Sequence, residues 1–170
     1  HRDLHVRSRR QRQMCIRDRE NDDGDDNIAI GPRALQLNED GEDNIAIGPR
    51  ALQNNDDGYS NIAIGEYALQ NNDDGDDNIA LGYDALLNNT GDDNIALGYD
   101  ALQNNTGDDN IAMGDSALQS NTIGVNNVAI GEDALYSNME GEYNIALGKE
   151  ALVDNTNGDN NIALGYGAEG

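Results

Sequence analysis

The sequence contains no tryptophan and no phenylalanine, and it has only one cysteine and two prolines. A single cysteine excludes an intrachain disulfide framework. Basic residues are also scarce, with 10 Lys and Arg against 33 Asp and Glu and a formal net charge of −23. This balance argues against nucleic acid or an anionic membrane as a partner of the bulk of the chain. No hydrophobic run approaches the roughly 18 residues of a membrane-spanning helix, so we expect no membrane insertion by this segment.

The first nineteen residues differ from the rest of the chain. Residues 1–19 hold seven of the ten basic residues, both histidines and the cysteine. The string RQMCIRDR at 12–19 resembles translated sequencing-adapter sequence. We therefore interpret residues 1–19 as a non-native or disordered basic segment of sequencing or cloning origin; the alternative is a basic tail that docks onto an acidic partner. Residues 20–170 form the predicted repeat domain, which we expect to be truncated at both ends.

Residues 20–170 consist of one short repeat. The unit N-I-A-[IL]-G-x-x-A-L-x-x-N-x-(x)-G-x-x recurs at spacings of 16 or 17 residues. A near-constant period of this length predicts a solenoid, in which each unit is one coil and identical residues stack on one another. Stacked asparagines at unit position one are expected to form an amide ladder. These asparagines are Asn27, Asn44, Asn61, Asn78, Asn94, Asn110, Asn127, Asn144 and Asn161.

The alternation of side chains in Asn-Ile-Ala-Ile-Gly predicts a short β-strand. A second strand is expected around the Ala-Leu pair, and glycine at position five and in the late turn would form the corners with positive φ. The fold class is therefore all-β, a parallel β-solenoid with 16–17 residues per coil and about eight full coils, paired at about 4.8 Å. The position-five corner glycines are Gly31, Gly48, Gly65, Gly82, Gly98, Gly114, Gly131, Gly148 and Gly165.

The larger apolar side chains, at positions two, four and nine, are predicted to point inward and form the core. The alanines at positions three and eight, such as Ala29 and Ala34, would then point outward. Because alanine is kept there in every copy, we expect these faces to be covered closely by other chains in a closed ring. The predicted core is Ile28, Ile30, Leu35, Ile45, Ile47, Leu52, Ile62, Ile64, Leu69, Ile79, Leu81, Leu86, Ile95, Leu97, Leu102, Ile111, Met113, Leu118, Val128, Ile130, Leu135, Ile145, Leu147, Leu152, Ile162 and Leu164.

The repeated N-I-A-[IL]-G-x-x-A-L motif resembles the YadA-like head repeats of trimeric autotransporter adhesins, and it is similar to repeats in phage and viral tail fibres. The resemblance covers residues 21–170. It implies a left-handed β-roll, a homotrimer, and an extracellular location on a bacterial cell surface or outer membrane, or on a virion. It also implies attachment to a receptor on host or matrix. The family repeat is usually shorter, with Ser/Val before Ala-Ile-Gly, so the resemblance supports the fold better than the binding partner.

Catalysis is not expected, because the repeat domain has no histidine or cysteine and its serines have no base at a recognisable spacing. No cofactor is expected, apart from calcium as an alternative. Turns such as Gly75-Asp76-Asp77-Asn78-Ile79 match half of the calcium-binding RTX nonapeptide, which suggests a secreted calcium-binding β-roll. The competing interpretation is that Asp and Asn are good turn residues that keep the rod soluble. The candidate calcium ligands are Asp77, Asp93 and Asp109.

Overall fold

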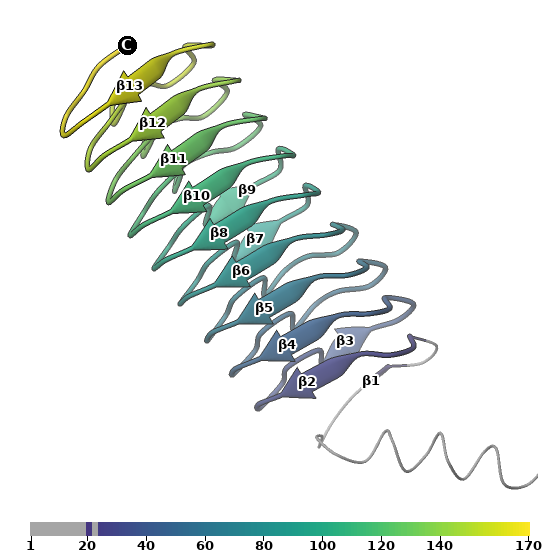
Figure 1. The fold of residues 1–170 in the computed structure, drawn as a ribbon. Coiled ribbons are helices and arrows are strands. Elements are labelled where there is room, and N and C mark those ends of the chain that lie inside the picture. The colour runs from purple at the N-terminus through teal and green to yellow at the C-terminus, as the bar shows by residue number, and fades with distance from the viewer. Residues whose placement is uncertain (1–19, 22–23) are drawn as a thin grey trace, which may run out of the picture.

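The computed structural model describes residues 20–21 and 24–170, so the prediction for residues 1–19 lies outside the described part. The chain winds into stacked coils, and each Asn-Ile-Ala motif supplies one three-residue strand (Figure 1). These strands form one parallel nine-stranded sheet, in which Ala80 pairs with Ala96 of the next coil. The predicted all-β parallel solenoid is confirmed. The strands are β2 (Ile28–Ile30), β4 (Ile45–Ile47), β5 (Ile62–Ile64), β6 (Ile79–Leu81), β8 (Ile95–Leu97), β10 (Ile111–Met113), β11 (Val128–Ile130), β12 (Ile145–Leu147) and β13 (Ile162–Leu164).

The opposite side of the coils forms a second, more interrupted parallel ladder, which lies behind the first sheet in Figure 1. Single bridges join Leu37 to Asn54, Asn54 to Asn71 and Asn71 to Asn88. Two strand pairs complete this ladder, β1 with β3 and β7 with β9. Across the described coils, no helix has the length and hydrophobicity needed to span a membrane. The strands of this side are β1 (Glu20–Asn21), β3 (Leu37–Asn38), β7 (Asn88–Asn89) and β9 (Asn104–Asn105).

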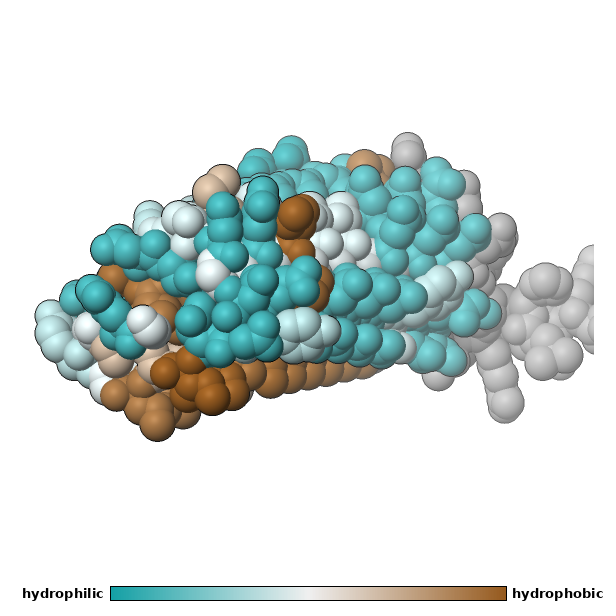
Figure 2. Space-filling model, turned by 90° about the horizontal axis from the view of Figure 1, so that it is seen from above, coloured by the Kyte–Doolittle hydropathy of each residue, from teal (hydrophilic) through white to brown (hydrophobic). Residues whose placement is uncertain are grey.

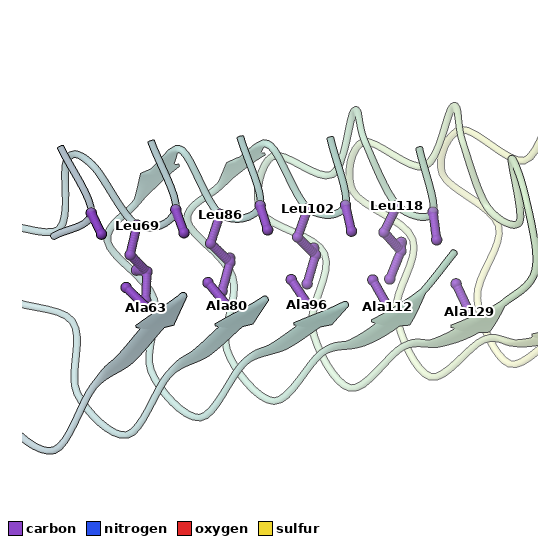
Figure 3. Packing of buried hydrophobic residues seen from close by; sticks show 14 of the residues in the cluster. Ala63, Leu69, Ala80, Leu86, Ala96, Leu102, Ala112, Leu118 and Ala129 are labelled. Atoms are coloured by element: carbon purple, nitrogen blue, oxygen red, sulfur yellow. The ribbon is translucent and has the colours of Figure 1, made fainter. Parts of the chain in front are cut away.

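The core consists of alanine and leucine, which corrects the sequence-based prediction at two of its three core positions, two and four. Leucine at position nine is buried in every full coil, as predicted, but the alanines at positions three and eight are buried with it. Figure 3 shows Ala80 and Ala96 of the first sheet pointing toward Leu86 and Leu102 from the opposite wall. The position-two and position-four side chains point outward instead, and none of them is buried. These outward residues are Ile28, Ile30, Ile45, Ile47, Ile62, Ile64, Ile79, Leu81, Ile95, Leu97, Ile111, Met113, Val128, Ile130, Ile145, Leu147, Ile162 and Leu164.

The narrow interior explains this inversion. Strand alternation places positions two and four on one side and position three on the other, but it does not say which side is inside. One leucine per coil fills the space between the two walls, so only a methyl group fits opposite it on the first sheet. The expectation that both alanine faces contact other chains is therefore wrong, since Ala80 and Ala85 have no exposed surface.

Glycine is required at the corners for two different reasons. At position five the backbone has positive φ, as predicted, with 142° at Gly65 and 148° at Gly82. A Cβ at Gly65 would also overlap the backbone of Gly82 in the next coil. The late-turn glycines do not have positive φ, contrary to expectation. At Gly75 a Cβ would instead collide with the buried side chain of Asn72 and, at 2.8 Å, with the backbone oxygen of Gly91 in the next coil. Close stacking between coils therefore determines both glycine positions.

Two columns of buried asparagine connect the coils. At position one, the expected ladder is present: Asn78 Oδ1 accepts the backbone N–H of Asn94 at 3.0 Å, and Asn78 Nδ2 donates to Gly91 O at 2.9 Å. A second column, at position twelve, was not anticipated as a ladder. There Asn72 Nδ2 donates to Asn55 Oδ1 at 2.9 Å and to Gly75 O at 2.7 Å. In both columns the buried amide therefore bonds to a late-turn glycine and to an asparagine of a neighbouring coil, as burial of polar groups requires.

Candidate functional site

The most extensive candidate interaction surface is the outer side of the first sheet, which we name the apolar face. It consists of the first and third side chains of each strand in that sheet, all Ile, Leu, Val or Met. Ile64 is 38% exposed and Ile130 is 41% exposed. Figure 2 shows the resulting hydrophobic band along one side of the solenoid, beside a mainly hydrophilic surface. A contiguous exposed apolar surface of this kind is typical of an interaction site.

The second side of the solenoid carries polar, uncharged side chains over several coils, and we name this the amide face. Its outward residues at position eleven form a ladder in which Asn54 donates to Asn71, Asn71 to Asn88, and Asn88 to Asn104, with N–O distances of 2.6–2.8 Å. Glutamines at position ten stack beside it, with Gln70 Nε2 donating to Gln53 Oε1 at 3.2 Å. The two faces are therefore chemically distinct. The apolar face can bind a partner only by excluding water, whereas the side chains of the amide face can also form hydrogen bonds with it.

The acidic turns form a third surface, and their carboxylates have a structural role. Asp92 Oδ1 accepts the backbone N–H of Asp76 at 2.9 Å, and Asp108 Oδ1 accepts that of Asp92 at 3.0 Å. Each of these bonds joins one coil to the next. The sequence analysis interpreted these acids only as good turn residues. Their recurrence directly after the late-turn glycine is the signal that could have predicted a structural role.

The candidate calcium ligands Asp77, Asp93 and Asp109 occupy the following coil position, one in each of three successive coils. Asp93 is exposed, but the neighbouring coils displace part of its hydration, which raises its pKa, and repulsion by Asp109 and Asp77 raises it further. Within residues 24–170, no three or more His, Cys, Asp or Glu side chains are grouped so as to hold a metal ion. Calcium binding therefore stays a prediction.

A cluster at positions six and seven interrupts the repeat pattern. Arg50 lies over the ring of Tyr67 at 5.2 Å, Tyr67 meets Tyr83 edge-on, and Tyr83 stacks on Tyr99 at 5.1 Å between ring centroids. These contacts join residues of four successive coils, so they run along the solenoid axis. Such pairs contribute about 0.5–1.5 kcal/mol each. We interpret the cluster as support between coils.

Asp84 lies beside this cluster, and its Oδ1 atom is the one buried side-chain oxygen in the described coils without a hydrogen-bond partner. In the next coil, the equivalent Asp100 accepts hydrogen bonds from Gln103 and Gln119, each at 3.1 Å. Leu87 occupies the coil position of Gln103 and has no donor to offer. Burial raises the pKa of Asp84, as does repulsion by Asp100, although Gln103 partly opposes the shift.

Searches of protein-family models, curated proteins and solved structures find no match to this chain. The surfaces of the solenoid therefore provide the basis for assigning a function to the chain.

Proposed function

We propose that residues 20–170 are a structural, adhesive module of a surface fibre, built from three parallel copies of this chain. The observation that supports this proposal is the apolar face, which extends over all nine strands of the first sheet and contains no charged side chain. Leaving such a surface in water costs about 25 cal/mol per Å² of apolar area. A partner that covers the face along its whole length removes this cost.

A second copy of the chain suits this partner role well. It has the same coil spacing, so its Ile and Leu columns match those of the first copy rung by rung. The face itself carries no charged side chain, and the acidic turns lie along its edge, as with Asp77 two residues before Ile79, so like-charge repulsion between copies is confined to that edge. Each chain presents two columns, position two and position four, so in a three-fold ring each column can meet a different neighbour. The number three comes from the resemblance to YadA-like heads.

The proposed activity is mechanical and adhesive, with no cofactor or catalytic step. A stiff rod on a bacterial cell surface would hold its exposed corners and amide face outward, where a receptor on host or matrix can bind. The same geometry would serve as a repeat of a phage tail fibre, which is the alternative assignment. Both share the self-association step, so that step is tested first.

The experiment compares two leucines of nearly equal exposure on opposite faces. Leu81 on the apolar face is 36% exposed, and Leu37 on the amide side is 37% exposed. Light scattering and sedimentation should show a trimer for the parent chain and for Leu37→Glu, but monomers for Leu81→Glu combined with Leu97→Glu. Circular dichroism should show that both variants keep the β fold. A folded, monomeric parent chain at micromolar concentration would overturn the trimer.

Adhesion is measured separately, with the chain displayed on non-adherent bacteria. We expect increased attachment to cultured epithelial cells or to immobilised matrix proteins, and loss of that attachment in the Leu81→Glu, Leu97→Glu variant. If the assembled trimer adheres to none of these surfaces, the adhesin assignment is wrong while the fibre assignment stands.

A further inference from the structure

We propose that Asn88 and Asn104 are acceptor sites for N-linked glycosylation on the amide face. Only these two asparagines in the chain begin an Asn-x-Thr tripeptide, Asn88-Asn89-Thr90 and Asn104-Asn105-Thr106. The tripeptide is the acceptor motif for attachment of a sugar to the asparagine amide. A motif alone is a weak signal, so the proposal depends on how the coils present it.

Strand alternation presents the acceptor and the hydroxyl on the same side. In β7, Asn88 is exposed and Asn89 is buried, and Thr90, the residue after the strand, is exposed again. The same pattern recurs in β9 and the residue after it, with Asn104 and Thr106 exposed. Both residues that a transferase must recognise therefore face solvent, and only the intervening residue points into the core.

The acceptor amides also keep a hydrogen to exchange. Asn88 Nδ2 donates one hydrogen bond, to Asn104 Oδ1 at 2.8 Å, and its second N–H has no partner within the protein. Asn104 Nδ2 makes only a long contact of 3.5 Å to Gln103 Oε1. By contrast, Asn89 Nδ2 donates to Asn72 Oδ1 and to Gly91 O. The buried asparagines are thus committed to the ladder, and the exposed ones are available.

The chemistry is a redox-neutral group transfer. The Nδ2 atom forms a bond to the anomeric carbon of a sugar activated as a nucleotide or lipid diphosphate. The bond between that carbon and the diphosphate oxygen breaks, and the amide gives up one proton to the enzyme's base. The remaining N–H of Asn88 can still donate to Asn104, so the surface ladder survives the modification. The sugars would lie on the second side of the solenoid, away from the apolar face (Figure 1).

The repeat supplies matched controls. Asn54 and Asn71 occupy the same coil position and the same ladder, but aspartate follows two residues later, at Asp56 and Asp73. We would express the full chain in a bacterial host together with a sequon-specific N-glycosyltransferase and a nucleotide-activated hexose. Intact-mass measurement and peptide mapping should then locate hexose at Asn88 and Asn104, and at neither Asn54 nor Asn71.

The variants test the motif and the fold separately. Thr90→Ala should abolish labelling at Asn88 only, and Asp73→Thr should create a new site at Asn71. Labelling of the purified, folded chain should match that of the chain labelled in the cell. If only heat-unfolded chain is labelled, the folded coils block the site and the proposal is wrong. It is equally wrong if neither form is labelled while an unstructured peptide with the same tripeptide is.

Discussion

Leucine at position nine shows how the coil balances backbone strain against burial. All eight of these leucines have φ between 48° and 52°, the left-handed region that costs a residue with a side chain about 1–2 kcal/mol. Each is also the only large apolar side chain of its coil that is fully or almost fully buried. Burying a leucine contributes about 1.5–3 kcal/mol, which offsets the strain. The corner is thus stable only because its side chain enters the core.

At the residue scale, the orphaned oxygen of Asp84 provides a first prediction. Leu87→Gln would place an amide where Gln103 lies in the next coil, within reach of Asp84. A hydrogen bond to a previously unpaired buried oxygen should raise the free energy of unfolding by about 1 kcal/mol. Chemical denaturation measures this gain. Leu87→Asn, whose amide is one methylene shorter, serves as the control and should give less.

The inverted core predicts how neighbouring residues of one strand respond to substitution. Ala80 is fully buried, so Ala80→Leu would overpack the interior and should cost about 1–3 kcal/mol. Ile79, which points outward, should accept Ile79→Leu with a change below about 0.5 kcal/mol. Thermal unfolding of the two variants distinguishes them. Equal destabilisation would contradict the assignment of alanine to the inside.

At the scale of an element, the buried asparagine column should be far less tolerant than the exposed one. Asn72→Asp removes the donors to Asn55 and Gly75 and buries a carboxylate beside their oxygens. We expect a loss of about 3 kcal/mol or more, because several buried groups lose their partners. Asn71→Asp, one residue earlier, alters only the surface ladder and should cost less than about 1 kcal/mol. Urea denaturation of both variants measures the contrast, and similar losses would contradict it.

The repeat pattern was sufficient to predict the fold class, because a near-constant short period of strand-like Asn-Ile-Ala-Ile-Gly segments with glycine corners indicates stacked parallel strands. It also identified the position-five glycines and the first asparagine column. It could not determine which side of the strand faces inward. A rule that buries the largest apolar residues placed Ile79 inside and Ala80 outside, whereas the narrow interior requires the reverse. The apolar face was therefore missed as a surface, and the left-handed corner at Leu86 has no signature in a single copy of the repeat.

At the scale of the whole molecule, stacking brings like charges close together. Acids at equal coil positions lie about 4.8 Å apart, where two unit charges repel by roughly 0.9 kcal/mol in water. Added salt should therefore raise the melting temperature. If calcium binds at Asp77, Asp93 and Asp109, millimolar calcium chloride should raise it further than sodium chloride of equal ionic strength. Equal effects of the two salts would exclude specific calcium binding.

The same repulsion predicts the pH dependence of stability. Loss of hydration and neighbouring acids raise the pKa of Asp93, and partial burial is the main cause of the raised pKa of Asp84 and Asp100. A carboxyl whose pKa is higher in the folded state binds protons more tightly when folded. Its contribution to stability is therefore fully present below the unfolded pKa, about 3.9, and is lost as pH rises through the folded pKa. The melting temperature should consequently increase as pH falls from 7 toward about 4.5, just above the sequence pI of 4.1.

Asp93→Asn tests this origin of the pH dependence at one column. Asparagine already occupies the same left-handed coil position at Asn126 and Asn160, with φ of 59° and 58°, so the substitution introduces no backbone strain. Removing one charge between Asp77 and Asp109 should raise the melting temperature at pH 7. The advantage should shrink as pH falls, because the parent carboxyl then becomes neutral as well. Calorimetry of both chains across this range, at constant ionic strength, measures the difference. An advantage that is independent of pH would show that the gain comes from turn preference and not from relief of charge repulsion.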